Sequence, residues 1–288
     1  MSKILFNLSG KIDTDTVDVL RNLKEVADSL SIPFFVVGAT ARDFILEHCY
    51  GISPRRMTID VDIGVEVADW DQYNNLCTAL LATEHFKEST EAQRIFYNDR
   101  AIDIIPFGSV ADADHNISWP PEHEILMSML GFDEAYASAV TVRINSDPVL
   151  DIKLPTLAGL AILKLIARSE TYPLRQKDAE DLHLIMLNYD HTANTARLFE
   201  QAPKLMEDSG FDTTKAAVRL LGRNMAANAN ENTFTKLQTI LLKETEESST
   251  YRLIRNMIQG AVEYDDNFDK TLNLLKKLRE GLFEGRQG

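Results

Sequence analysis

The hydrophobic pattern of this chain changes at Pro155. Before it, short apolar runs such as residues 33–37 are typical of buried strands, and they alternate with segments of helical spacing such as residues 14–30. After it, apolar residues recur every three to four positions in successive segments with no convincing strand between them: 156–169, 175–189, 193–208, 214–228, 232–246, 250–262 and 267–282. This pattern predicts an α+β protein with a mixed-sheet N-terminal domain, residues 1–154, and an all-helical C-terminal domain, residues 155–288.

The same periodicities predict further elements in the N-terminal half. We expect helices at 39–50 and 70–83, and strands around Asp60 and Asp62, at 94–97, at 101–105, and in the runs AVTVRI and PVLDIKL. The Asn98-Asp99 pair predicts a turn, and Pro106 and Gly108 are expected to end the strand at 101–105.

Composition narrows the class of protein. With 288 residues, 44% of them hydrophobic, the chain is long enough to bury a full core. Its formal net charge of -14 argues against broad binding to DNA, which depends on a basic surface. No apolar run approaches the roughly 18 residues of a membrane helix, and the N-terminal residues lack a signal pattern. We therefore expect a cytoplasmic protein with no membrane partner, in which Cys49 and Cys77 are reduced core residues.

Asp60 and Asp62 are the most informative pair of side chains. They stand two residues apart in the β-branched run 58–67, and side chains two apart on a strand project to one face, with their backbones about 6–7 Å apart. Neighbouring carboxylates repel each other, and a divalent cation removes this cost because Mg2+ prefers carboxylate and phosphate oxygens. The pair therefore predicts a metal site, although a solvated strand face explains a lone D-x-D equally well.

Asp103 is a third acid inside an apolar strand, where an ionised side chain must be paired, metal-bound or at an exposed end. One interpretation is a strand-end residue near solvent. The other is a third carboxylate beside Asp60 and Asp62, which shares a metal and accepts the proton of an attacking hydroxyl. Three such acids suit in-line nucleotidyl transfer assisted by two ions. We expect two Mg2+ ions, with Mn2+ as the alternative.

Gly38 follows a buried strand and precedes a helix, a geometry that lets backbone amides approach a phosphate group. Arg42 lies four residues later and offers a forked cation to a triphosphate, or else a simple surface salt bridge. The turn and the three acids together favour a nucleotide-binding site.

The segments VVGATARDFIL, RMTIDVDIGV and AIDIIPF resemble the nucleotidyltransferase superfamily that shares the DNA polymerase beta catalytic core. That pattern is a Gly-Gly or Gly-Ser turn, a D-x-D strand and a later strand Asp. Within this superfamily, the chain resembles the nucleotidyltransferase-like toxins of abortive-infection toxin-antitoxin systems. The residues that carry this resemblance are the run from Arg56 to Asp62, Lys164 in AILKLIARSE, and Arg175 with the nearby KDAEDL. The resemblance spans roughly residues 34–186.

The resemblance implies a role for each matching residue. Asp60, Asp62 and Asp103 would hold metal, Lys164 would contact the triphosphate, and Asp178 and Asp181 would line an active site that the helical domain completes. The implied nucleotide-binding residues are Gly38, Ala39, Thr40, Arg42, Thr58 and Lys164. Ala39 departs from the family pattern, because it replaces the second Gly or Ser of the turn, and Thr40 offers a substitute hydroxyl. Residues 39–46 also resemble tRNA nucleotidyltransferases and poly(A) polymerases, whose base-selecting motif has no clear counterpart in this chain.

Physical chemistry leaves a second interpretation of the helical residues. Lys164 lies in an apolar helix, where burying an ammonium is costly unless an anion meets it. Asp178 and Asp181 are three residues apart and share a helix face, so Lys177 or Arg175 could simply pair with them in a structural ion network.

Three functional hypotheses follow. The first is a metal-dependent enzyme that transfers NMP from an NTP to a hydroxyl of RNA, such as a tRNA 3' end, or of a protein, as the toxin of a toxin-antitoxin pair with an antitoxin partner. The second is nucleotidylation of a small molecule of the aminoglycoside kind, which the acidic composition would suit. The third is a catalytically silent protein that binds a partner.

Overall fold

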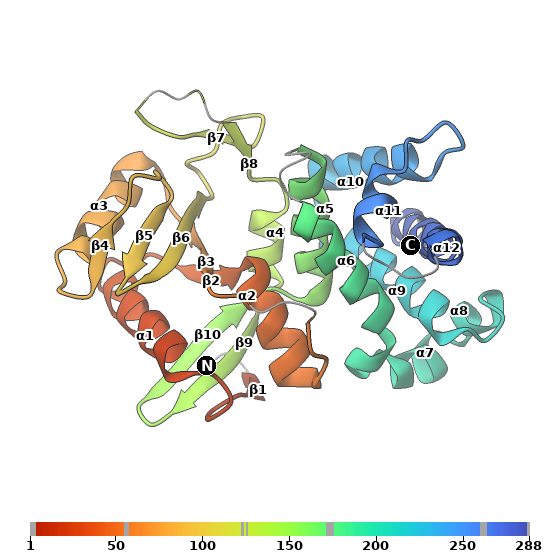
Figure 1. The fold of residues 1–288 in the computed structure, drawn as a ribbon, viewed down its shortest axis with the longest axis horizontal. Coiled ribbons are helices and arrows are strands. Elements are labelled where there is room, and N and C mark those ends of the chain that lie inside the picture. The colour runs from red at the N-terminus through yellow and green to blue at the C-terminus, as the bar shows by residue number, and fades with distance from the viewer. Residues whose placement is uncertain are drawn as a thin grey trace. The chain divides into compact units, whose positions relative to one another are not determined.

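The structure is a computed structural model that describes residues 4–54, 58–121, 124, 126–170, 176–259 and 264–286 (Figure 1). The chain forms two compact units, Met1–Thr156 and Leu157–Gly288, which are described separately below. The first unit contains mixed sheets and the second contains helices. This confirms the predicted α+β class.

The main sheet of the first unit has five strands in the order β2-β3-β6-β5-β4. Strands β3 and β6 run parallel, and the other neighbours are antiparallel. The bounds are β2 Phe34–Val37, β3 Val61–Glu66, β4 Phe86–Glu88, β5 Arg94–Tyr97 and β6 Arg100–Phe107. The sheet therefore brings the segment around Asp62 beside the segment around Asp103.

Two smaller sheets complete the strands. In the first, β9 (Val140–Ser146) pairs with β1 (Ile4–Asn7) in parallel and with β10 (Val149–Leu154) antiparallel. The second is an antiparallel pair, β7 (Asn116–Ser118) with β8 (Leu126–Ser128). The predicted pair AVTVRI and PVLDIKL is confirmed as β9 and β10, whereas the sequence did not predict β1, β4, β7 or β8.

Two helices of the first unit begin at an aspartate whose side chain caps them. Asp13 accepts a hydrogen bond from the backbone amide of Thr16 at the start of α1 (Thr14–Ser29), and Asp69 does so from Gln72 at the start of α3 (Trp70–Leu81). The predicted helix at 39–50 is confirmed as α2 (Gly38–Asp43), which continues into the π-helix η1 (Phe44–Cys49). Helix α4 (Phe132–Ala137) was not predicted.

The two ends of one face of the main sheet differ. At the carboxyl end of β3, the rings of Phe35, Phe107, Phe132 and Tyr136 form an apolar layer, with the centroids of Phe35 and Phe107 5.4 Å apart. Phe35 stands opposite Gly64, and Gly64 is two residues from Asp62 on the same face. The aromatic layer therefore covers one end of this face, and the acids lie at the other end.

Two local predictions need correction. Pro106 lies inside β6, which continues to Phe107 and ends before Gly108. A proline is tolerated there because β5 pairs with β6 only as far as Asp103, so no strand on that side requires the missing N–H of Pro106. Asp60 lies in a bend before β3 rather than inside the strand. The reason is that β2 ends at Val37, opposite Asp62, so no residue of β2 is left to pair with Asp60.

The second unit contains helices and no strand among its described residues, 157–170, 176–259 and 264–286. The helices are α5 Leu157–Glu170, α6 Gln176–Asn188, η2 Asp190–Asn194, α7 Thr195–Gln201, α8 Pro203–Asp208, α9 Thr213–Asn228, α10 Glu231–Thr245, α11 Arg252–Met257 and α12 Tyr264–Glu284. The predicted helices match these with two exceptions: α11 ends at Met257, short of the predicted 250–262, and 193–208 is divided. Pro203 starts a new helix there, because proline lacks the N–H that a helix interior needs. No helix in the described part of the chain combines the length and apolar composition needed to cross a membrane.

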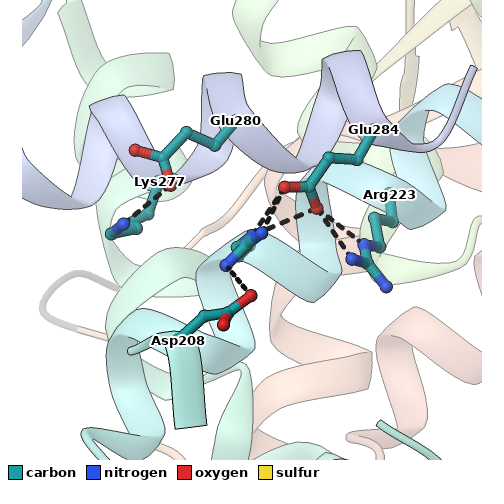
Figure 2. Close-up of polar contacts among 6 residues, drawn as sticks. Asp208, Arg223, Lys277, Glu280 and Glu284 are labelled. Carbon is teal, nitrogen blue, oxygen red and sulfur yellow. Dashed lines mark hydrogen bonds and ion pairs between the residues drawn. The ribbon is translucent and has the colours of Figure 1, made fainter. Parts of the chain in front are cut away.

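Helices α9 and α12 pack closely enough to require glycine at their crossing. A Cβ atom on Gly281 would lie 1.8 Å from the carbonyl oxygen of Arg219, and one on Gly222 would lie 2.2 Å from that of Leu278. Glu284 on α12 also accepts hydrogen bonds from Arg219 and Arg223 on α9, with Arg223 Nε 2.9 Å from Glu284 Oε2 (Figure 2). Backbone contact and paired charges therefore both hold this pair of helices together.

Candidate active site

Asp62 and Asp103 are direct neighbours across two parallel strands. Asp62 is the second residue of β3, and its partner in the register with β6 is Asp103. Residues paired in this way project to the same face, and adjacent strands lie about 4.8 Å apart. Both side chains are partly exposed, in contrast to the buried apolar residues around them. The fold thus brings together two acids that are 41 positions apart in sequence.

Asp60 is exposed and stands just before β3. Its backbone carbonyl accepts a hydrogen bond from Thr40 Oγ1 at 2.8 Å, which ties this bend to α2. Thr40 is buried, and its hydroxyl makes this hydrogen bond to the bend. The Asp60 carboxylate is close enough to Arg94 to help raise the pKa of that guanidinium, as described below.

Gly38 lies directly against the carboxylate of Asp62. Its φ of +65° is in the left-handed region, and a Cβ atom there would lie 1.9 Å from Asp62 Oδ2 and 2.5 Å from Asp62 Cγ. A glycine is therefore required both by the backbone conformation and by the space that Asp62 occupies. The turn predicted to approach a phosphate contacts one of the predicted metal-binding acids.

Arg94 holds Asp103 through two hydrogen bonds. Arg94 Nε lies 2.7 Å from Asp103 Oδ1, and Arg94 Nη2 lies 3.0 Å from Asp103 Oδ2. A third contact joins Arg94 Nη1 to Glu91 Oε1 at 3.2 Å. The hydrogen bonds that Arg94 donates to Asp103, with the negative charges of Asp103, Glu91 and Asp60, raise the pKa of Arg94 against the opposing effect of burial. Arg94 is thus the cation that neutralises Asp103 in this structure.

Arg94 was not among the predicted site residues, although the sequence contains a signal for its position. The turn at Asn98-Asp99 pairs Tyr97 with Arg100, and counting outward from this pair places Arg94 opposite Asp103. An Arg and an Asp that face each other across an antiparallel pair are expected to form an ion pair.

The fit of these residues to a metal ion is partial. Among the residues that the structure describes, no group of three His, Cys, Asp or Glu side chains is arranged to hold a metal ion. The structure therefore does not gather Asp60, Asp62 and Asp103 into one set of metal ligands. Arg94 accounts for part of this, because it binds both oxygens of Asp103. Two carboxylates at D-x-D spacing next to a glycine bend still suit a hard cation that takes its other ligands from phosphate oxygens or water. The metal site itself stays a prediction.

Arg42 has a different environment from the one expected for a triphosphate ligand. Its side chain is only 1% exposed, and its guanidinium forms an ion pair of 2.5 Å with Asp43. It also donates to Thr58 Oγ1 at 3.4 Å. These contacts connect α2 to the segment that leads into Asp60, which gives Arg42 a structural task. Phosphate binding by Ala39, Arg42 and Thr58 stays a prediction, and Arg56 lies outside the described residues.

The second predicted group forms a buried ion cluster in the helical unit. Lys164 Nζ on α5 lies 2.7 Å from Asp178 Oδ1 and 2.8 Å from Asp181 Oδ2, both on α6. Burial lowers the pKa of Lys164, but the charges and hydrogen bonds of the two carboxylates outweigh it, so the pKa of Lys164 is raised overall. The structural ion network considered from the sequence pairs Asp178 and Asp181 with Lys177 or Arg175, whereas the structure joins both acids to Lys164. Arg175 lies outside the described residues, and contact of Lys164 with a triphosphate stays a prediction.

A scan against protein-family models finds no match, and a search of curated proteins finds none either. The chain resembles several solved structures at low sequence identity. They include an antigenic nucleotidyltransferase-like protein from Paracoccidioides brasiliensis, with a TM-score of 0.40 and 18% identity over 70% of this chain and 92% of that one.

Two further solved structures also resemble this chain. The antibiotic-resistance factor ANT(2'')-Ia, solved in complex with adenylyl-2''-tobramycin, has a TM-score of 0.36 and 14% identity over 68% of this chain and 97% of that one. The Thermotoga maritima CCA-adding enzyme, solved with tRNA, has a TM-score of 0.27 and 16% identity over 97% of this chain and 83% of that one. Because these TM-scores are low, the likeness does not identify the activity of this chain.

Proposed function

We propose that this protein is a metal-dependent nucleotidyltransferase that moves NMP from an NTP to a hydroxyl group. The observation that carries the proposal is the contact between Gly38 and Asp62, with Asp103 as the neighbour of Asp62 across the parallel strands. It supports the proposal because a glycine bend pressed against paired strand acids lets a phosphate chain and its counter-ion approach the same point.

Each residue has a distinct task in this proposal. Asp60 and Asp62 would hold Mg2+ or Mn2+, with Thr40 fixing the bend that carries Asp60. A divalent ion bound there would neutralise charge on the triphosphate oxygens while the acceptor oxygen attacks the α-phosphorus in line and pyrophosphate leaves. Asp103 would accept the proton of the attacking hydroxyl, which requires that Arg94 release at least one of its oxygens.

The acceptor is proposed to be RNA, such as a tRNA 3' end, or a protein hydroxyl. In this proposal the protein is a cytoplasmic toxin with a protein antitoxin. The test is expression in a bacterial host: the wild type is expected to arrest growth, and Asp62→Ala to allow growth at the same protein level. Arrest by both proteins would rule out toxicity through nucleotidyl transfer.

Transfer itself is tested with each α-labelled NTP, Mg2+ and cell extract. We expect label in RNA or protein with the wild type, and at least a hundredfold less with Asp62→Ala, since a metal-binding acid is lost. Asp28→Ala on α1 is the matched control, because that exposed acid pairs only with Lys24 among the contacts seen. Equal labelling by the wild type and Asp62→Ala would contradict the proposal.

The net charge of -14 favours a second candidate, transfer to a cationic small molecule of the aminoglycoside kind. Replacing the extract with purified aminoglycosides distinguishes the two acceptors. Label that appears only in the small molecule would select this candidate, and label in RNA or protein would select the first. A silent, partner-binding protein would produce no label in either assay.

A further inference from the structure

We propose that Arg94 is a built-in cation that occupies Asp103 in the resting protein, so that Asp103 joins a metal site only after Arg94 is displaced. This inference rests on the proposed function, because it assumes that Asp60 and Asp62 bind a divalent ion. It makes Arg94 a positioning residue that sets the order in which the acids take up ions.

The geometry of the Arg94–Asp103 pair supports this role. The two side chains face each other from β5 and β6, and the guanidinium uses both oxygens of the carboxylate, at 2.7 and 3.0 Å. Two parallel hydrogen bonds of this kind are stronger and more directional than a single ion pair. A metal ion that needs an Asp103 oxygen must therefore compete with Arg94.

When a metal ion displaces Arg94 from Asp103, a neighbouring acid is available as an alternative partner for the guanidinium. Glu91, about half exposed, lies 3.2 Å from Arg94 Nη1, on the nitrogen that Asp103 does not contact. Both Arg94 and Asp103 are partly exposed, at 23% and 17% of their side chains, so the guanidinium can leave without being buried elsewhere. Glu91 therefore gives Arg94 a second position in which its charge remains paired.

The three acids are not grouped as a metal site among the described residues. Arg94 faces Asp103 from β5, on the side of β6 away from β3 and Asp62, and it occupies both oxygens that a metal ion would use. The expected order is that Asp60 and Asp62 bind the first ion, and that Asp103 becomes a ligand in a second, weaker step.

Direct Mn2+ binding tests this order without any assay of activity. Free Mn2+ is measured by electron paramagnetic resonance while the wild type, Arg94→Gln, Asp103→Asn and the double variant are titrated. We expect Arg94→Gln to bind Mn2+ about tenfold more tightly, or to bind one additional ion, because a competing cation is removed. The double variant should return to the wild-type value, since the gain requires the Asp103 carboxylate.

Arg143→Gln is the matched control. Arg143 pairs with Asp151 across β9 and β10 through the same two nitrogens, at 2.8 and 3.0 Å, with similar exposure. This variant removes the same charge and the same kind of ion pair, and its Mn2+ binding should equal that of the wild type.

Three results would overturn the inference: equal Mn2+ binding by Arg94→Gln and the wild type, a gain that persists in the double variant, or the same gain in Arg143→Gln. The proposed function fails in a different way. If the wild type binds no Mn2+ that is lost in Asp62→Ala, the metal basis of both proposals is removed.

Discussion

The backbone of Gly38 lies so close to the carboxylate of Asp62 that a methyl group on Gly38 would be 1.9 Å from Oδ2. An acid that is pressed against a turn keeps its position only while the turn keeps its shape. The position of Asp62 is therefore set by Gly38 as well as by the register of β3.

Gly38→Ala should displace Asp62 and abolish Mn2+ binding and NMP transfer, with losses of about a hundredfold or more if the site depends on Asp62. Gly10→Ala separates this effect from backbone strain. Gly10 has a similar φ of +78°, but no atom lies within 4 Å of its missing Cβ. Both variants should lose about 1–2 kcal/mol of stability through the left-handed backbone, and only Gly38→Ala should lose function. Retained Mn2+ affinity in Gly38→Ala would contradict this assignment.

Lys164→Met should destabilise the helical unit by about 3–5 kcal/mol, because the buried carboxylates of Asp178 and Asp181 would lose the Lys164 ammonium that pairs with both. The measurement is the urea midpoint of unfolding. Lys236→Met is the control: Lys236 forms a more exposed pair with Glu170 at 2.7 Å, and its loss should cost less than about 1 kcal/mol. A cost for Lys164→Met as small as that of the control would show that the cluster does not stabilise the unit.

Gly281→Ala tests the close crossing of α9 and α12. Alanine in a helix normally stabilises by about 1 kcal/mol relative to glycine. Here the new methyl group would lie 1.8 Å from the carbonyl oxygen of Arg219, so we expect a lower melting temperature. Lys276→Ala, an exposed position on the same helix, should change stability by less than about 0.5 kcal/mol. A stabilised Gly281→Ala would mean that the helices separate at little cost.

The lowered pKa of Glu284 leads us to expect that stability depends on pH. Burial raises the pKa of this carboxyl group, but hydrogen bonds and charges from Arg219 and Arg223 lower it more, so the pKa is lowered overall. A carboxyl group whose pKa is lower in the folded state stabilises the fold above its unfolded pKa, about 4.3, and this contribution is lost as the pH falls below that value. Glu284→Gln should therefore be less stable than the wild type at pH 7, and the difference should shrink at acidic pH, as the pH falls through the lowered pKa of Glu284.

Glu280→Gln provides the comparison in the pH experiment. Glu280 pairs within α12 with Lys277 and is 40% exposed, so the variant should resemble the wild type at both pH values. A stability difference for Glu284→Gln that does not shrink in acid would show that its ion pairs with α9 are not the cause.

Much of this fold could be predicted from the sequence because its helices follow local rules. The periodic segments after Pro155 became helices close to the expected bounds, and Asp212 and Asn230 cap α9 and α10 with their side chains. The short strands β1, β4, β7 and β8 were not predicted, whereas β2 and β5, each of four residues, were, because the turn signals at Gly38 and Asn98-Asp99 mark their ends. Strand β1 in addition pairs with β9, a segment that is distant in the sequence.

The candidate site was predictable in its residue types and less so in its contacts. Asp62 and Asp103 were expected to meet, and their register in β3 and β6 brings them side by side. The burial of Arg42 against Asp43 could not be foreseen, because a residue's depth depends on how the whole unit packs. Arg94 was within reach of prediction, through the hairpin at Asn98-Asp99.

The parallel pairing of β3 with β6 has a consequence for how this chain can vary in length. Parallel neighbours need a long connection, and here it consists of α3, β4 and β5. Extra residues at the exposed bend near Thr90 would lengthen this connection without altering the spacing of Asp62 and Asp103. A single residue inserted in β3 would instead turn Asp62 to the opposite side of the sheet. The connection between β3 and β6 can therefore grow or shrink between homologues, while β3, the strand that carries Asp62, cannot.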